Sequence, residues 1–74
     1  MEYPIKLESL EALRKLNATA SKMQYSIYVQ TETGVIDAKS MLGLWFALSK
    51  PAKLIVPKDI EPNDLEVLLA AVLV

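Results

Sequence analysis

The feature that most constrains the fold is a rapid alternation of strand-like and helix-like patterns within 74 residues. Apolar residues at every second position predict short strands at residues 3–7, 25–31, 35–38 and 52–56. Apolar residues three and four apart predict helices between and after these strands. The predicted order is β-α-β-β-α-β-α, which indicates an α+β chain with one sheet and helices on one face. A chain of this length is expected to form a single domain, residues 1–74.

The first predicted helix begins after Ser9, whose hydroxyl is expected to cap its free N–H groups. Its apolar positions recur three or four residues apart, at Leu13, Leu16, Ala20 and Met23. Charged residues occupy the other face. This pattern predicts an amphipathic helix with one face toward a core.

The second predicted helix covers residues 41–48, after a cap at Ser40. It is expected to end before Pro51, because the residue preceding a proline avoids the helical conformation. The stretch is apolar almost all round, so a buried strand is the alternative, and Gly43 slightly weakens the helix prediction. Leu44 and Leu48 are expected to share the core face.

The last predicted helix follows a loop at residues 58–63. Pro62 suits a first helical turn, and Asp64 lies early, where the helix dipole favours an acid. The apolar positions of this helix are Leu65, Leu68, Leu69 and Val72. The longest apolar run, residues 67–74, is far shorter than the ~20 residues that a membrane span needs.

Composition excludes several classes of function. The chain has no histidine and no cysteine, so it offers neither an imidazole nor a thiol for catalysis or metal binding. No acidic cluster has the spacing of a calcium loop, and neither a metal nor another cofactor is expected. The net charge of −1 argues against nucleic-acid binding. No signal-peptide pattern opens the sequence, so a cytoplasmic location without membrane attachment is expected.

Three stretches resemble one known family. Residues 20–23 (Ala-Ser-Lys-Met), 26–29 (Ser-Ile-Tyr-Val) and 37–44 (Asp-Ala-Lys-Ser-Met-Leu-Gly-Leu) are similar to HPr, the histidine-containing phosphocarrier of the bacterial sugar phosphotransferase system. That family shows an Asn-Ala-Lys-Ser-Ile-Met-Gly-Val stretch at the matching position. The resemblance implies an open-faced β-sandwich, in which a four-stranded antiparallel sheet carries three helices on one face.

The resemblance is weakest where the chemistry of the family lies. Counting back from residues 20–22 places Ser9 at the phosphorylated histidine and Glu11 at the arginine that would neutralise the phosphate. A serine phosphoester is too stable to serve as a relay, and the charge at residue 11 is reversed. We therefore expect no phosphate relay, and the plain interpretation of Ser9 is a helix cap.

Ser40 matches the serine that a regulatory kinase phosphorylates in some members of the family. A phosphate at a helix N-terminus is electrostatically favourable, which suits a switch. The alternative is again a plain cap. Met41, Leu42 and Trp45 match the apolar docking surface of the family, with Met41 and Trp45 one turn apart. Trp45 could instead fill the core, and the surface could equally belong to a homodimer.

These features predict a non-catalytic HPr-like protein with a protein–protein regulatory role in carbon metabolism. The expected partners are phosphotransferase or carbon-control proteins, or a serine kinase, and a homodimer is left open. The sequence contains no nucleophile paired with a suitable base, so an enzyme is not expected. Two alternatives remain: a small-molecule sensing module on a ferredoxin-like frame, and a structural homodimer or assembly subunit suggested by the apolar residues 67–74.

Overall fold

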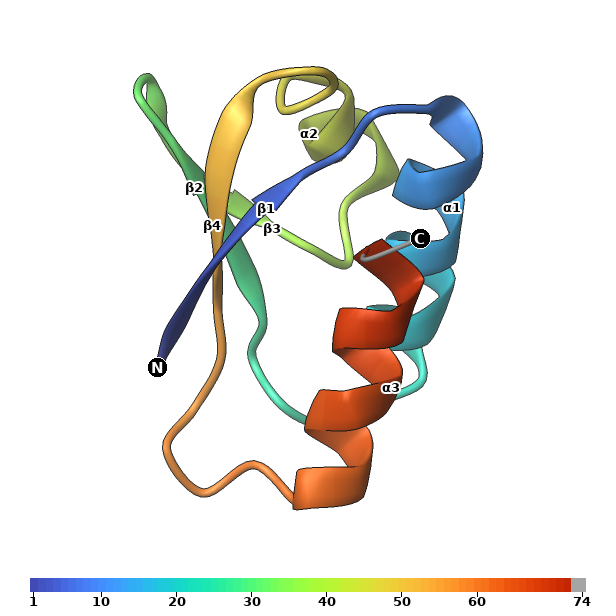
Figure 1. Cartoon of the computed structure of the whole chain (residues 1–74), viewed down its shortest axis with the longest axis vertical. Coiled ribbons are helices and arrows are strands. Elements are labelled where there is room, and N and C mark those ends of the chain that lie inside the picture. The colour runs from blue at the N-terminus through green and yellow to red at the C-terminus, as the bar shows by residue number, and fades with distance from the viewer. Residues whose placement is uncertain (73–74) are drawn as a thin grey trace.

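The computed structural model describes residues 1–72 of the chain, which form one sheet and three helices. The strands are β1 (Glu2–Lys6), β2 (Tyr28–Thr31), β3 (Gly34–Asp37) and β4 (Pro51–Ile55), and the helices are α1 (Leu10–Ser21), α2 (Met41–Trp45) and α3 (Pro62–Val72). The strands are ordered β1-β4-β2-β3, and each neighbouring pair is antiparallel. The predicted element order and the open-faced sandwich are confirmed (Figure 1).

Alternation along the strands gives the sheet one buried and one open face. Ile5, Val29 and Leu54 are buried on the face toward the helices. Pro4, Lys53 and Gln30 are neighbours in register and lie exposed on the other face. The strands therefore contribute a layer to the core and leave a polar surface outside.

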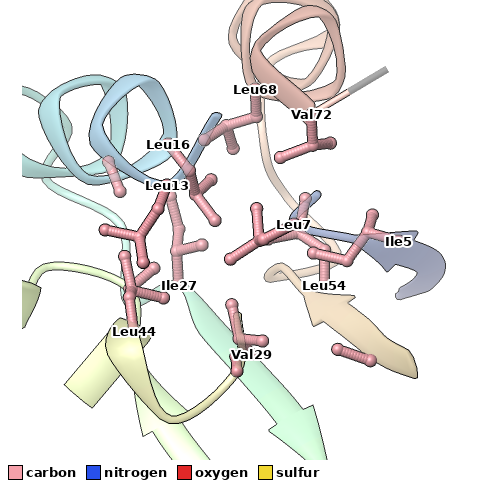
Figure 2. Close-up of a cluster of buried hydrophobic side chains, with 14 of the residues drawn as sticks. Ile5, Leu7, Leu13, Leu16, Ile27, Val29, Leu44, Leu54, Leu68 and Val72 are labelled. Carbon is pink, nitrogen blue, oxygen red and sulfur yellow. The ribbon is translucent and has the colours of Figure 1, made fainter. Parts of the chain in front are cut away.

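The helices cover the buried face of the sheet, with α1 and α3 side by side (Figure 1). The core face of α1 presents Leu13 and Leu16, and that of α3 presents Leu68 and Val72. Figure 2 shows Leu13 and Leu16 beside Ile27, and Leu68 and Val72 above Leu7. All of them belong to one buried cluster, which also contains Leu54. The spacing of apolar residues in the sequence thus matches the packing.

The β2–β3 hairpin turns through Glu32 and Thr33 into Gly34, which has a φ of 150°. A side chain at this φ would be strained, so the glycine that indicated a turn in the sequence is required here. The hairpin pairs Val29 with Ile36, which holds β3 at the edge of the sheet.

The ends of several elements differ from the predictions. Helix α1 ends at Ser21, so Met23 lies in the following loop, half-buried, rather than on the helix. Strand β2 begins at Tyr28, although Ile27 is buried as expected. Helix α3 begins at Pro62, within the predicted loop.

The largest difference concerns α2, which ends at Trp45 and not at residue 48. Leu48 forms a parallel bridge with Leu7, and the N–H of Ser49 donates to the Leu7 carbonyl at 2.7 Å. Because these long-range contacts hold residues 48 and 49 beside Leu7, the helix ends before Pro51. Leu48 is half-buried rather than part of a helical core face, while Leu44 is buried as predicted.

The strand order rules out the ferredoxin-like frame considered from the sequence. That frame has its first and third strands in the centre of the sheet, whereas β1 and β3 are the two edges here. Residues 67–72 of the apolar run 67–74 form the last part of α3, which ends at Val72. Leu73 and Val74 lie outside the described residues.

Candidate functional site

The segment from Asp37 to Phe46 is held against the rest of the fold by a few specific contacts. The Asn17 side chain on α1 donates to the Ala38 carbonyl at 3.2 Å, and the Lys39 ammonium donates to the Met23 carbonyl at 2.8 Å. The side chain of Leu44 is fully buried. These contacts fix α2 at the corner between α1 and β3.

Ser40 caps α2. Its Oγ accepts a hydrogen bond from the Gly43 N–H at 3.1 Å, and its own N–H donates to the Asp37 carbonyl at 2.9 Å. The residue is exposed, so its hydroxyl can be reached from solvent. The cap predicted from the sequence is confirmed, whereas a regulatory role for Ser40 stays a prediction.

The surroundings of Ser40 are poor in available positive charge. The nearest cation along the chain is Lys39. Its ammonium donates to the Met23 carbonyl, and its backbone N–H donates to the carboxylate of Asp37 at 2.9 Å. Helix α2 has only five residues, so its dipole is small. A phosphate on Ser40 would therefore add negative charge close in sequence to the Asp37 carboxylate, at the start of a short helix and next to a lysine whose ammonium is bound elsewhere.

Gly43 explains how closely α2 approaches the sheet. A Cβ at this position would lie 2.7 Å from the Cγ2 of Ile36 on β3, which is closer than two carbon atoms can pack. The glycine, which weakens the helix prediction, is therefore the residue that lets α2 rest on β3.

An apolar surface covers the outer side of α2, and we call it the α2 face. Its members are exposed to the extent of 37% for Met41, 79% for Leu42, 48% for Trp45 and 68% for Phe46. The structure brings together the three residues predicted as a docking surface. Trp45 does not fill the core, as the alternative would require.

Phe46 is the member of the α2 face that the sequence reasoning missed. It follows Leu42 by four residues, the spacing that places two side chains on one helical face. The sequence prediction placed Met41, Leu42 and Trp45 outside, but it assigned Phe46 to neither face because nearly every residue of the stretch is apolar.

The N-terminal end of α1, where the family carries its histidine, has a different character. The Oγ of Ser9 accepts from the Ala12 N–H at 3.1 Å, which confirms the predicted cap. Glu11 pairs with Lys15 at 3.3 Å and Glu8 with Lys6 at 3.5 Å, all at the surface. Exposed ion pairs thus flank Ser9 on both sides, and residue 11 carries a negative charge where the resemblance placed an arginine.

A polar contact at the opposite end of the helix layer escaped the sequence reasoning. The hydroxyl of Tyr25 donates to the Asp64 carboxylate at 3.0 Å and accepts from the Glu61 N–H at 3.1 Å. The Glu61 N–H lowers the pKa of the phenol, but desolvation, the hydrogen bond to Asp64 and the charges of Asp64 and Glu61 outweigh it, so the pKa of Tyr25 is raised above 10.0. This contact ties the loop after α1 to the start of α3.

Within residues 1–72, no group of three or more acidic, histidine or cysteine side chains is placed to hold a metal ion. No helix in the described part of the chain has the length and apolar character needed to cross a membrane.

Comparison with known proteins identifies the architecture. The structure matches an HPr-C-His protein from Thermoanaerobacter tengcongensis with a TM-score of 0.73 at 22% identity, over 97% of this chain and 90% of that one. It also matches the phosphocarrier protein HPr of Bacillus anthracis, with a TM-score of 0.73 at 14% identity, over 97% and 95% of the two chains. This chain has the HPr fold.

A histidine-containing phosphocarrier protein from Mycoplasma has a TM-score of 0.75 at 10% identity, over 96% of this chain and 90% of that one. No protein-family model matches the sequence, and no curated protein matches it. The HPr fold is therefore preserved at a level of identity at which structure, rather than sequence, carries the likeness.

Proposed function

We propose that this chain is a non-catalytic HPr-like binding protein that docks on a protein partner through the α2 face. The observation that carries the proposal is the exposure of all four apolar side chains of that face, at the corner of the HPr fold where α2 contacts α1 and β3. Small soluble domains rarely leave such a contiguous apolar surface uncovered unless it binds something. Trp45 and Phe46 are of the types that dominate binding energy in protein interfaces.

The proposed partners are proteins of the phosphotransferase system or of carbon control, in the cytoplasm. This part rests on the HPr fold and on the resemblance of residues 37–44 to the family. The chain contains no histidine, and the residue that the sequence resemblance places at the phosphocarrier histidine is Ser9, which caps α1. We therefore propose recognition of such partners without phosphate relay.

Ser40 is proposed as the switch of this surface, phosphorylated by a serine kinase. A phosphoserine carries about −1.5 to −2 charges at neutral pH. It would stand beside Met41, close in sequence to the Asp37 carboxylate and with Lys39 already engaged. Phosphorylation is therefore expected to weaken docking on an apolar or acidic partner site and to favour a site that supplies arginine.

Docking can be measured through Trp45, because it is the only tryptophan of the chain. Titration with purified phosphotransferase or carbon-control proteins should shift its emission to shorter wavelength, because docking removes water from the half-exposed indole. Leu42→Ala should weaken binding at least tenfold, while the matched control Val67→Ala, an exposed apolar residue on α3, should leave it unchanged. Equal effects of the two variants would argue against the α2 face.

The switch is tested separately. Incubation with a serine kinase of the HPr-directed class should add about 80 Da, and Ser40→Ala should remove the increase while Ser9→Ala keeps it. If Ser9→Ala also removes the mass increase, or if wild type shows no increase, the proposal that Ser40 is a phosphorylated switch is wrong. The docking proposal would then stand on the fluorescence experiment alone.

A further inference from the structure

The two edges of the sheet are protected to different degrees. Edge strand β1 carries Pro4, which lacks an N–H, and the charged residue Lys6, both of which discourage a further strand. Edge strand β3 has the sequence Gly-Val-Ile-Asp, with neither proline nor lysine, and its Val35 is 60% exposed. Strand β3 is thus the edge to which another strand can be added.

The register shows which backbone groups of β3 are free. The N–H of Ala38 donates to the Ile27 carbonyl at 2.9 Å, and Ile36 lies opposite Val29. Antiparallel residues alternate between facing the partner strand and facing away from it. The N–H and C=O of Val35 and the N–H of Asp37 therefore point away from β2, where no strand among residues 1–72 pairs with them.

Part of the α2 face adjoins this edge. Gly43 is the residue of α2 that rests on Ile36 of β3. Phe46 follows Gly43 by three residues, so it lies on the side of α2 that is turned toward β3, with Leu42 one turn before it. A strand added to β3 would therefore have an apolar surface beside it as well as free hydrogen-bonding groups.

We propose that a second copy of this chain pairs with the β3 edge, strand β3 against strand β3 in antiparallel orientation, centred on Val35. This inference goes beyond the docking function and does not depend on it. The segment is complementary to itself in this register: Val35 lies beside its equivalent on the open face, and Ile36 lies opposite Gly34, which has no side chain and no atom within 4 Å of its Cβ position.

The charges of this register are also compatible. Asp37 falls opposite the uncharged Thr33, and no two like charges are brought face to face. The net charge of −1 gives little long-range repulsion between copies.

The exposed surface is small for a protein interface. Val35, Leu42 and Phe46 expose on the order of 400 Å² of side chain per copy, about half of the roughly 800 Å² that each partner of a standard interface buries. Strand backbone and polar rim supply part of the remainder. The dimer should therefore be weak, with a dissociation constant on the order of 10 μM.

Sedimentation velocity of the 74-residue chain between about 1 μM and 1 mM tests the dimer. Wild type should shift from monomer to dimer across this range. Val35→Lys should raise the dissociation constant at least tenfold, because it sets two like charges side by side on the pairing axis. The matched control Val67→Lys, an equally exposed valine on α3, should leave it unchanged. A monomer at every concentration would overturn the proposal.

Amide exchange locates the interface. Amide protons of Val35 and Asp37 should gain protection as concentration rises, while those of β1 should not. A dimer that survives Val35→Lys but dissociates in Trp45→Lys, without added protection in β3, would show pairing through the α2 face and would overturn the edge-strand proposal. Leu42 belongs to both surfaces, so docking is measured at protein concentrations below the dissociation constant of the dimer, where the two proposals fail independently.

Discussion

Helices α1 and α2 begin in the same way and then diverge. In both, a serine Oγ accepts a 3.1 Å hydrogen bond from the N–H three residues later, Ala12 in one case and Gly43 in the other. Helix α1 continues for 12 residues and buries Leu13, Leu16 and Ala20. Helix α2 stops after five residues and buries only Leu44. The cap determines where a helix starts, whereas the surfaces that its faces meet determine what the helix does.

The surroundings of the two caps differ as well. Ser9 lies between the carboxylates of Glu8 and Glu11, on a helix whose apolar face is covered. Ser40 is followed by the uncovered apolar side chains of the α2 face. The N-terminal end of α1 thus carries charged pairs around its cap, whereas α2 leaves its apolar residues exposed to solvent.

The largest expected effect contrasts a core residue of α1 with an outer residue of α2. Leu16→Ala should lower the free energy of unfolding by about 3 kcal/mol, because it leaves a cavity among fully buried side chains. Leu42→Ala should change it by less than about 0.5 kcal/mol, since the side chain is mostly in water. Urea unfolding followed by circular dichroism measures both. Similar losses in the two variants would show that the α2 face is part of the core.

Gly43→Ala is expected to have the next largest effect. Alanine favours a helix by about 1 kcal/mol over glycine, but its Cβ would meet Ile36 at 2.7 Å. The net result should be a loss of roughly 1–2 kcal/mol on urea unfolding. Adding Ile36→Ala should recover part of that loss, and a double-mutant cycle with no coupling between the two sites would contradict the close contact.

Removing the caps should cost less. Ser9→Ala and Ser40→Ala should each lower stability by about 1 kcal/mol. The difference between the helices should emerge in hydrogen exchange: loss of the Ser40 cap should speed exchange in α2, which has few other anchors, while α1 stays protected by its buried face. Ser→Thr at either position keeps the acceptor and serves as the control. Equal acceleration of amide exchange in α1 of Ser9→Ala and in α2 of Ser40→Ala would contradict this expected difference between the helices.

The smallest effect concerns the far end of α1, where Tyr25 reaches α3. Because its folded-state pKa is raised, the folded protein holds the phenolic proton more tightly than the unfolded chain. The contribution is complete below the ordinary pKa of 10.0 and is lost as pH rises through and above that value. Between about pH 9 and 11, the free energy of unfolding should decrease less with pH in Tyr25→Phe than in wild type. Tyr28→Phe, which changes an exposed tyrosine outside this contact, is the control, and an unchanged slope in Tyr25→Phe would contradict the assignment.

The sequence predicts most of the fold because most of its elements are determined locally. Leu13 and Leu16 are spaced for one buried helical face, and Ile27 and Val29 alternate as a strand does, so local pattern and tertiary packing agree. The end of α2 could not be predicted in this way. It depends on Leu7, which bonds to residues 48 and 49 from more than 40 positions away.

The candidate site is only partly visible in the sequence. Met41, Leu42 and Trp45 follow from the family resemblance, and their exposure is confirmed. Phe46 does not, because a run that is apolar on every side carries no periodic signal to separate the inner from the outer face. The hydrogen bonds of Tyr25 to Glu61 and Asp64 span 36 and 39 residues, so no pattern in the sequence around Tyr25 indicates them.

The short bond between Ser49 and Leu7 has a mechanical consequence. Ser49 adopts a φ of 62°, a left-handed conformation that costs a residue with a side chain about 1–2 kcal/mol, and its N–H meets the Leu7 carbonyl at 2.7 Å. Leu7 lies two residues before Ser9, and Ser49 three residues after Phe46. The bond therefore joins the connection that follows α2 directly to the connection that precedes α1. The openings of β4 and α1 are held together at this one point, although they lie some forty residues apart in the sequence.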